Sequence, residues 1–322
     1  MNQATVDKFL AKLIGTGLFY APSRQDGQVK VLPIEDQRQI DWSGDMPVNS
    51  FKNIFLPASE TLFENNKAIF ENENKTFVWG MNVLDLQALT LFEQVFEKDI
   101  YFQRRRQNIF VCGYTGGLEA DYRRYKAQHL SYEENILEHL IFDVFIEKQK
   151  DGNFLAFSGS EKGQQLLEEN GITDYENIEF AGIIPQKGVN PVIAAKRLAI
   201  EQSAEDPIWD ELAQTCLACG KCSIVCPTCF CFDEKDKAEF ANVKKVRQWG
   251  NCFYPEFSKV AGGHKDLDSV KKKLYFWYTH KFVRIPDEYN YYGCVGCGRC
   301  VRVCPVGIDI AKNIQRLKKE KS

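Results

Sequence analysis

The chain has 322 residues and a mass of 37.0 kDa, with 44% hydrophobic and 26% charged residues and a formal net charge of −3. This composition suits about two folded domains and excludes a disordered chain, collagen and a coiled coil. No apolar run reaches the ~18 residues that a membrane helix needs, and Met1–Leu10 lacks a signal-peptide pattern. We therefore expect a cytoplasmic protein without a membrane span.

Residues 1–195 are predicted to form an α/β domain. Short apolar runs predict strands, and apolar residues at steps of three and four predict a helix. The predicted strands are Asn53–Pro57, Thr76–Gly80 and Asn108–Gly113, and the predicted helix covers Asp85–Phe96. Farther along, two apolar runs flank Asp151-Gly152, a pair typical of a hairpin turn, which predicts paired strands over residues 142–146 and 154–157.

Residues 196–322 are predicted to form a second domain, which is mainly helical and ferredoxin-like. Helix-forming residues lead into Ser203–Pro207, which marks the junction. Segments Lys237–Trp249 and Asp268–His280 are predicted to be helical, and both lie in an insertion over residues 232–290. The fold class is therefore mixed, α+β, with an α/β domain followed by a helical one.

Cysteine is concentrated in the second domain, since eleven of the twelve cysteines lie between Cys216 and Cys304. A long chain without a signal peptide is unlike a secreted disulfide scaffold, so the thiols indicate metal ligation in a reducing compartment. Residues 196–322 carry 22 Lys and Arg against 16 Asp and Glu, a formal +6. Two iron–sulfur clusters, at roughly −2 each, would nearly neutralise this excess, so it does not predict nucleic-acid binding.

A cysteine pattern occurs twice. Cys216-Leu-Ala-Cys219-Gly-Lys-Cys222-Ser-Ile-Val-Cys226-Pro has the form C-x2-C-x2-C-x3-C-P, and Cys294 to Pro305 repeats it. In such ferredoxin-type runs the fourth cysteine binds the other cluster. The spacing therefore predicts two [4Fe-4S] clusters. The first would be bound by Cys216, Cys219, Cys222 and Cys304, and the second by Cys294, Cys297, Cys300 and Cys226.

Other metal assignments compete with this one. Zinc also uses C-x2-C pairs, although two full copies with both prolines favour iron–sulfur clusters. Cys229, Cys231 and Cys252 remain, and with His264 they could form an additional metal site. The simpler interpretation is that these thiols are buried beside the clusters, where they tune cluster potential. Cys112 follows an apolar strand and is interpreted as a core residue.

The sequence resembles the family that comprises the sulfhydrogenase β subunit and the dicluster electron-transfer subunit of anaerobic sulfite reductase. The similarity is carried by Cys216–Asp233, Trp249–Cys252, Ala261–His264 and Cys294–Ile310, and more weakly by Leu56–Phe63 and Trp79–Phe96. The resemblance implies an iron–sulfur protein that relays electrons between a flavoprotein oxidising NAD(P)H and a catalytic subunit, either siroheme sulfite reductase or nickel–iron hydrogenase. The chain departs from the family at Gly80–Asp85, where members commonly carry Arg-Pro-Cys-Asp.

We therefore expect a non-catalytic electron-transfer subunit, because the sequence shows no catalytic constellation of its own. Two alternatives stay open: an enzyme whose third site at Cys229, Cys231 and Cys252 binds substrate at an open iron, and an iron–sulfur redox sensor. Lys271–Lys273, with Lys281 and Arg284, is interpreted either as a surface for an acidic partner or as a solvated helix.

Overall fold

The structure is a computed structural model that describes residues 1–70, 74–116, 135–184, 191–239 and 242–319. The chain divides into two compact units. Unit 1 comprises Met1–Phe55 and Asn72–Ile184, and unit 2 comprises Leu56–Glu71 and Pro185–Ser322. Unit 2 thus includes a segment from the N-terminal half of the sequence, Leu56–Glu71, in addition to the C-terminal half.

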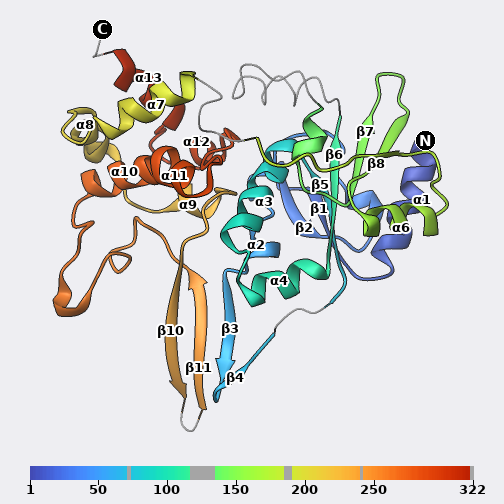
Figure 1. Ribbon diagram of the computed structural model, residues 1–322, viewed down its shortest axis with the longest axis horizontal. Coiled ribbons are helices and arrows are strands. Elements are labelled where there is room, and N and C mark those ends of the chain that lie inside the picture. The colour runs from blue at the N-terminus through green and yellow to red at the C-terminus, as the bar shows by residue number, and fades with distance from the viewer. Residues whose placement is uncertain (71–73, 117–134, 185–190, 240–241, 320–322) are drawn as a thin grey trace. The chain divides into compact units, whose positions relative to one another are not determined.

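Among the described residues of unit 1, seven strands form one mixed sheet (Figure 1). In spatial order these are β2 (Gln28–Pro33), β1 (Leu18–Gln25), β5 (Thr76–Met81), β6 (Ile109–Thr115), β7 (Val144–Lys148), β8 (Phe154–Ser158) and β9 (Glu176–Asn177). The central strands β1, β5, β6 and β7 run parallel, whereas β2 and β8 are antiparallel to their neighbours β1 and β7. The predicted strands at β5 and β6 and the β7–β8 hairpin are confirmed.

Helices cover both faces of this sheet. The helices are α1 (Gln3–Ile14), α3 (Val83–Val95), α4 (Ile100–Gln107) and α6 (Glu161–Glu169), with short turns η1 (Gln37–Gln39), α2 (Lys52–Phe55) and η2 (Ile136–His139). Leu10 of α1 and Leu167 of α6 pack with Cys112 in one buried core. Gly113 faces the opposite side, where it lies against Leu86 of α3. The result is a three-layer α/β/α arrangement, and Cys112 is a core residue.

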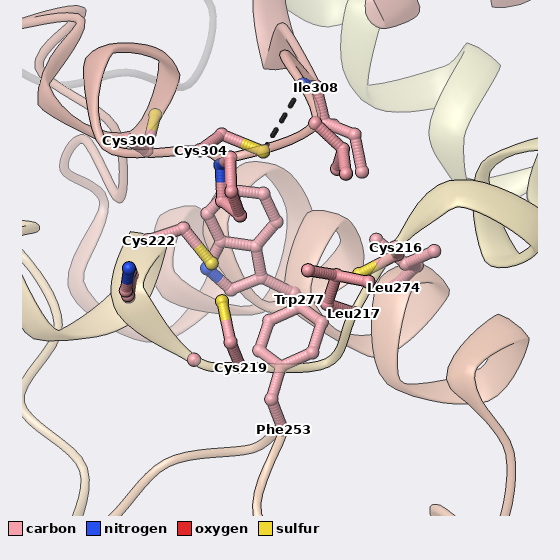
Figure 2. A pocket seen from close by; sticks show the side chains of 14 residues that line it. Cys216, Leu217, Cys219, Cys222, Phe253, Leu274, Trp277, Cys300, Cys304 and Ile308 are labelled. Carbon is pink, nitrogen blue, oxygen red and sulfur yellow. Dashed lines mark hydrogen bonds between the residues drawn. The ribbon is translucent and has the colours of Figure 1, made fainter.

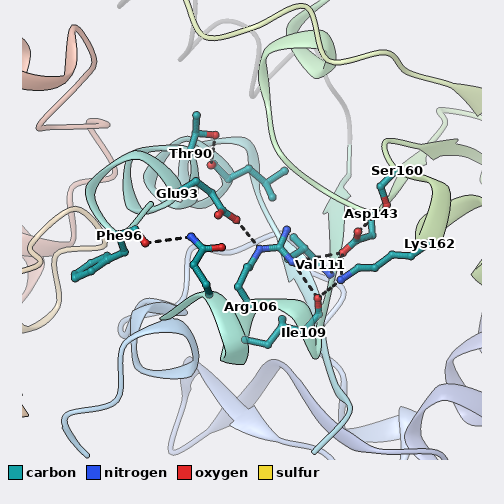
Figure 3. Close-up of polar contacts among 11 residues, drawn as sticks. Thr90, Glu93, Phe96, Arg106, Ile109, Val111, Asp143, Ser160 and Lys162 are labelled. Carbon is teal, nitrogen blue, oxygen red and sulfur yellow. Dashed lines mark hydrogen bonds and ion pairs between the residues drawn. The ribbon is translucent and has the colours of Figure 1, made fainter. Parts of the chain in front are cut away.

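A buried carboxylate joins the strand ends in unit 1 (Figure 3). Asp143, just before β7, accepts hydrogen bonds from the Val111 backbone N–H and the Ser160 hydroxyl, each at 2.7 Å. Lys162 Nζ lies 3.5 Å from the same carboxylate, while Arg106 pairs with Glu93 of α3 at 2.6 Å. These contacts hold the beginning of β7 and the start of α6 against β6 and leave the buried charge compensated.

In the part of unit 2 that the structure describes, four strands form a second, antiparallel sheet (Figure 1). Their spatial order is β10 (Phe232–Glu239), β11 (Asn242–Trp249), β3 (Ser59–Glu64) and β4 (Lys67–Ala68). Strands β3 and β4, from the N-terminal half of the sequence, therefore add to the β10–β11 hairpin from the C-terminal half. A buried ion pair joins the two, since Arg247 Nη2 lies 2.7 Å from Glu60 Oε1.

The rest of unit 2 is mainly helical. Its elements are α7 (Pro191–Glu201), α8 (Ile208–Thr215), α9 (Lys221–Ile224), η3 (Ala261–Gly263), α10 (Val270–Thr279), the π-helical turn η4 (His280–Arg284), α11 (Ile285–Tyr289), α12 (Arg299–Arg302) and α13 (Ile310–Lys319). Trp209 of α8, Tyr278 of α10 and Ile314 of α13 centre its buried core. No helix among the described residues has the length and apolar character needed to cross a bilayer.

Two predicted elements are wrong. Residues 52–55 form the short helix α2, and β3 begins only at Ser59, after Pro57. Segment Lys237–Trp249 was predicted as a helix, but its described part belongs to β10 and β11, with residues 240–241 outside the described chain. Val243 and Val246 are three residues apart, which imitates helical spacing, whereas pairing with β3 favours the strand.

Candidate metal centre

The first cysteine run follows helix α8 directly. Cys216 caps α8, and Gly220, at φ +73°, turns the chain into the four-residue helix α9. Ala218 also has a positive φ of 49°, which is uncommon for a residue with a Cβ. These turns direct the thiols of Cys216, Cys219 and Cys222 into one cavity.

The second run repeats this backbone. Gly296 and Gly298 have φ of +68° and +72°, at the positions that Ala218 and Gly220 occupy in the first run, and Gly298 begins the four-residue helix α12. The sequence duplication is therefore also a duplication of local structure. Glycine suits these positions because positive φ is strained for other residues.

The fourth cysteine of the second run reaches the cavity of the first run. The first cavity is lined by Cys216, Cys219, Cys222 and Cys304, together with Cys300 and apolar side chains that include Phe253, Leu274 and Trp277. Figure 2 shows the sulfur of Cys300 directed away from the other four. The structure thus brings together the four cysteines that the spacing assigned to the first cluster.

The other four cysteines are coupled electrostatically. Burial raises the pKa of the Cys300 thiol, and the neighbouring Cys226, Cys294 and Cys297 raise it further. Burial likewise raises the pKa of Cys294. Crowding of buried thiols is costly when they ionise, unless a cation compensates the charge. The predicted second set therefore also lies in one neighbourhood.

Protein donors approach several of these sulfurs. The Ala218 N–H donates to Cys216 Sγ at 3.4 Å, and the Ile308 N–H donates to Cys304 Sγ at 3.3 Å. Lys281 Nζ donates to Cys226 Sγ at 3.2 Å. Hydrogen bonds to cluster sulfurs are among the means by which a protein sets cluster potential.

Cys226 differs from the other buried thiols. A hydrogen bond with Cys229 and the charge of Lys281 hold the pKa of Cys226 well below its ordinary value, against the effect of burial. Burial acts to lower the pKa of Lys281, but the Cys226, Cys229 and Cys294 sulfurs raise it above its ordinary value. Lys281 is only 2% exposed, so its interpretation as part of a surface for a partner is wrong.

The donor set fits iron–sulfur clusters better than zinc. A single zinc ion draws its thiolate ligands to about 2.3 Å, whereas each thiolate of a cubane binds a different iron. Within the residues that the structure describes, no three His, Cys, Asp or Glu side chains are arranged around one metal ion. The cysteines instead line cavities, and the indole N–H of Trp277 in the first cavity is buried without a hydrogen-bond acceptor. A cluster sulfur would supply that acceptor.

The remaining cysteines also converge. Cys229, Cys231 and Cys252 line a second cavity with Ser223, Thr228, Trp277, His280 and Lys281. Burial raises the pKa of Cys252 to about 12, with Cys231 and Cys222 contributing. Burial lowers the pKa of His280 to about 4, so its imidazole is neutral at pH 7.

His264 lies elsewhere. Its side chain is 72% exposed and its Nε2 lies 3.2 Å from Asp266 Oδ1. His280, which lines the second cavity, could not be predicted as a site residue, because it lies at the end of a predicted helix and no spacing connects it to the cysteines. Lys281 was interpreted from the sequence as part of a surface or a solvated helix, and its burial beside Cys226 was not predicted.

Comparison with known proteins agrees with this site. Residues 215–308 match the family described as a 4Fe-4S dicluster domain. Over 97% of its length the chain is 24% identical to sulfhydrogenase 2 subunit beta of Pyrococcus furiosus, of which it covers 95%. The chain is a homologue of a sulfhydrogenase β subunit. The predicted resemblance is confirmed, and a dicluster domain carries two [4Fe-4S] clusters, as the cysteine spacing predicted.

Two further relatives match only part of the chain. A segment of 123 residues is 28% identical to pyruvate-flavodoxin oxidoreductase of Trichormus variabilis, and a segment of 124 residues is 30% identical to the putative pyruvate-flavodoxin oxidoreductase of Synechocystis sp.. Each match covers 38% of this chain and 8% of the relative. No solved structure matches the chain.

Proposed function

We propose that this sulfhydrogenase β-subunit homologue relays electrons between a flavoprotein that oxidises NAD(P)H, or a ferredoxin, and the catalytic subunit of a cytoplasmic oxidoreductase. Anaerobic sulfite reductase and nickel–iron sulfhydrogenase are the two candidate complexes. The observation that carries the proposal is the position of Cys304 in the cavity of the first run. A crossed fourth ligand holds two clusters side by side, which suits a relay.

The proposed ligands follow the two runs. Cys216, Cys219, Cys222 and Cys304 would hold the first cluster, and Cys294, Cys297, Cys300 and Cys226 would hold the second. Each bound cluster supplies a centre that accepts and donates one electron. The chain's own residues bury these thiols, donate hydrogen bonds to their sulfurs and exclude water from the first cavity with apolar side chains.

Four protein ligands for each cluster leave no iron open for a substrate, so we assign substrate conversion to a partner protein. The relative in Pyrococcus furiosus is itself named as a subunit, which supports a hetero-oligomer. All twelve cysteines lie in the described residues and none of them forms a disulfide, which agrees with a reducing compartment such as the cytoplasm.

Ligand replacement tests the crossed arrangement. EPR of dithionite-reduced protein, prepared without oxygen, should lose the same cluster signal in Cys304→Ala as in Cys219→Ala, and the other signal in Cys226→Ala as in Cys297→Ala. Cys112→Ala, in the core of unit 1, is the control and should keep both signals. Loss of one signal in both Cys219→Ala and Cys226→Ala would contradict the crossing, and zinc in place of iron would overturn the electron-transfer function.

The relay is tested by rapid mixing. Dithionite-free, reduced protein should be reoxidised within seconds by an oxidised two-cluster bacterial ferredoxin, followed as recovery of cluster absorbance. Reduced clusters that persist for minutes in the presence of this acceptor would contradict a relay. The Cys219→Ala variant is a suitable comparison because it interrupts the proposed path at the first cluster.

A further inference from the structure

The second cavity holds a set of metal-ligating side chains that the dicluster pattern does not use. Cys229, Cys231 and Cys252 line it from one polypeptide region, and His280 and Lys281 line it from another. Neither cysteine run supplies a cysteine to this cavity, which adjoins the predicted second cluster because Cys229 and Lys281 both contact Cys226.

The β10–β11 hairpin of unit 2 brings Cys231 and Cys252 together. In the β10–β11 hairpin Phe232 pairs with Trp249, so the residues just outside the hairpin, Cys231 and Gly250, also meet. The Gly250 N–H donates to the Cys231 carbonyl at 2.9 Å. Cys252 follows two residues later and is 5% exposed. Cys231 and Cys252 are about twenty residues apart in the sequence, and the hairpin between them places their thiols near each other.

The π-helical turn η4 supplies the opposite wall. Such turns widen a helix locally and are frequent at functional sites. Here the turn begins at His280 and presents both His280 and Lys281 to the second cavity. The His280 ring is stacked on Phe276 with centroids 5.6 Å apart and meets Phe230 edge-on at 5.8 Å. Aromatic contacts on two sides fix the orientation of the imidazole.

A buried donor also points to a missing acceptor. Trp277 lines both the first and the second cavity, is 4% exposed, and its indole N–H has no hydrogen-bond partner. Buried donors in native proteins are almost always paired. A cluster sulfur in either of the two cavities that Trp277 lines would supply this acceptor, so the unpaired N–H indicates cluster binding at this wall but does not by itself assign a cluster to the second cavity.

We propose that Cys229, Cys231, Cys252 and His280 bind a third iron–sulfur cluster of the [4Fe-4S] type. Three thiolates and one neutral imidazole would give the oxidised cluster one negative charge, and the buried ammonium of Lys281, which also donates to Cys226 Sγ, lies in the same wall. With four ligands the cluster has no open iron, so it serves electron transfer and not substrate binding. The role of this cluster as a third electron carrier rests on the proposed relay function. The presence of the cluster does not depend on that function.

Cluster content tests the site independently of electron transfer. After anaerobic reconstitution with ferrous iron and sulfide, the wild-type chain should contain about twelve iron and twelve sulfide, four of each per cubane. The variant Cys229→Ala/Cys231→Ala/Cys252→Ala should contain about eight of each and keep the two cluster signals of the dicluster domain. Cys112→Ala is the matched control and should retain about twelve. About eight iron in the wild-type chain, or one zinc that the triple variant loses, would overturn the proposal.

The histidine ligand is tested with milder variants, since the triple variant risks misfolding. Pulsed EPR of the reduced wild-type protein should show a nitrogen coupling from a coordinated imidazole. His280→Cys should lose this coupling with iron content unchanged, because cysteine is also a ligand. His264→Ala, at the exposed histidine, should keep the coupling. A nitrogen coupling that persists in His280→Cys would overturn the assignment of His280.

Discussion

Lys281 Nζ lies 3.2 Å from Cys226 Sγ, and both residues are buried. The same ammonium donates to Thr228 Oγ1 at 3.1 Å and to the Gly293 carbonyl at 3.2 Å. Thr228 in turn donates to that carbonyl at 2.8 Å. Gly293 immediately precedes the second cysteine run. The hydrogen bonds of Lys281 therefore connect the end of the first run, at Cys226, to the beginning of the second.

Replacing Lys281 with methionine should lower the reduction potential of the cluster that Cys226 is proposed to bind. Reduction adds a negative charge, which a nearby cation stabilises, so removing the cation favours the oxidised form. At an effective dielectric constant of about 20, a unit charge some 4–8 Å away changes the potential by on the order of 100 mV. An EPR-monitored redox titration measures the shift.

A surface lysine provides the control for this titration. Lys271 pairs with Asp210 at 2.8 Å on the exposed side of α10. Lys271→Met removes the same charge from a solvated position, where screening makes it ineffective, and should leave the potential unchanged. Equal potentials for Lys281→Met and the wild type would show that the buried charge does not act on this cluster.

The two equivalent glycines before α9 and α12 should respond differently to substitution. Gly220 has φ of +73° and Gly298 has φ of +72°, so alanine costs about 1 kcal/mol of backbone strain at either position. A Cβ at Gly220 would lie 2.2 Å from Asn251 Nδ2, whereas a Cβ at Gly298 meets nothing within 4 Å. Asn251 is buried and donates to the Gly220 carbonyl, so it has little room to move.

We therefore expect Gly220→Ala to lose most of the signal of the first cluster and Gly298→Ala to retain both signals. Iron content and EPR intensity of anaerobically purified variants measure the difference. Equal iron content in the two variants would mean that the loop of the first run shifts to accommodate the methyl group, and that Asn251 does not fix its position.

The cysteine pattern was sufficient to predict the two clusters because cluster ligation depends on short local spacings. Cys216 to Cys226 and Cys294 to Cys304 are each contiguous, and the backbone repeats at Gly220 and Gly298 follow from the repeated sequence. The parallel strands at the centre of unit 1 could also be predicted, because β5 and β6 are short apolar runs in the sequence.

The features that sequence analysis missed depend on contacts between distant segments. Strand β11 is stabilised by pairing with β3, about 185 residues earlier, and its own spacing imitates a helix. His280 and Cys252 line the same cavity because of the π-helical turn at His280, whereas His264, which is nearer to Cys252 in sequence, is exposed. Local periodicity contains no information on such pairings.

The ion pair of Arg247 and Glu60 should be essential for the sheet of unit 2. Arg247 Nε donates to Glu60 Oε1 at 2.8 Å, and both side chains are at most 3% exposed. Arg247→Met leaves the Glu60 carboxylate buried without this partner and should lower the free energy of unfolding by about 3–5 kcal/mol. Denaturant unfolding under anaerobic conditions measures the change.

An exposed ion pair between the same two strands serves as the comparison. Lys244 Nζ lies 3.3 Å from Glu64 Oε1, with both side chains 35% exposed. Lys244→Met should cost less than about 1 kcal/mol. The double variant Glu60→Leu/Arg247→Met should recover much of the loss, because it removes the buried charge as well. A single Arg247→Met variant as stable as Lys244→Met would contradict a structural role for the buried pair.

Cys112 should make the stability of unit 1 depend on pH in the alkaline range. Burial raises the pKa of this thiol far above its ordinary value, and Asp143 raises it further. In the unfolded chain the thiol ionises near pH ~8.5. Above that pH the unfolded state binds one proton fewer than the folded state, so the free energy of unfolding falls as the pH rises, by up to about 1.4 kcal/mol per pH unit.

The effect is isolated by comparing the wild type with Cys112→Ala, because the other cysteines titrate alike in both chains. The difference in unfolding free energy between the two proteins should decrease by about 1.4 kcal/mol between pH 7.5 and pH 9.5. Denaturant titrations followed by tryptophan fluorescence measure it, since Trp42 and Trp79 pack in the same core as Cys112. A difference that stays constant over this range would mean that Cys112 reaches solvent and ionises in the folded protein, contrary to its position beneath α1 and α6.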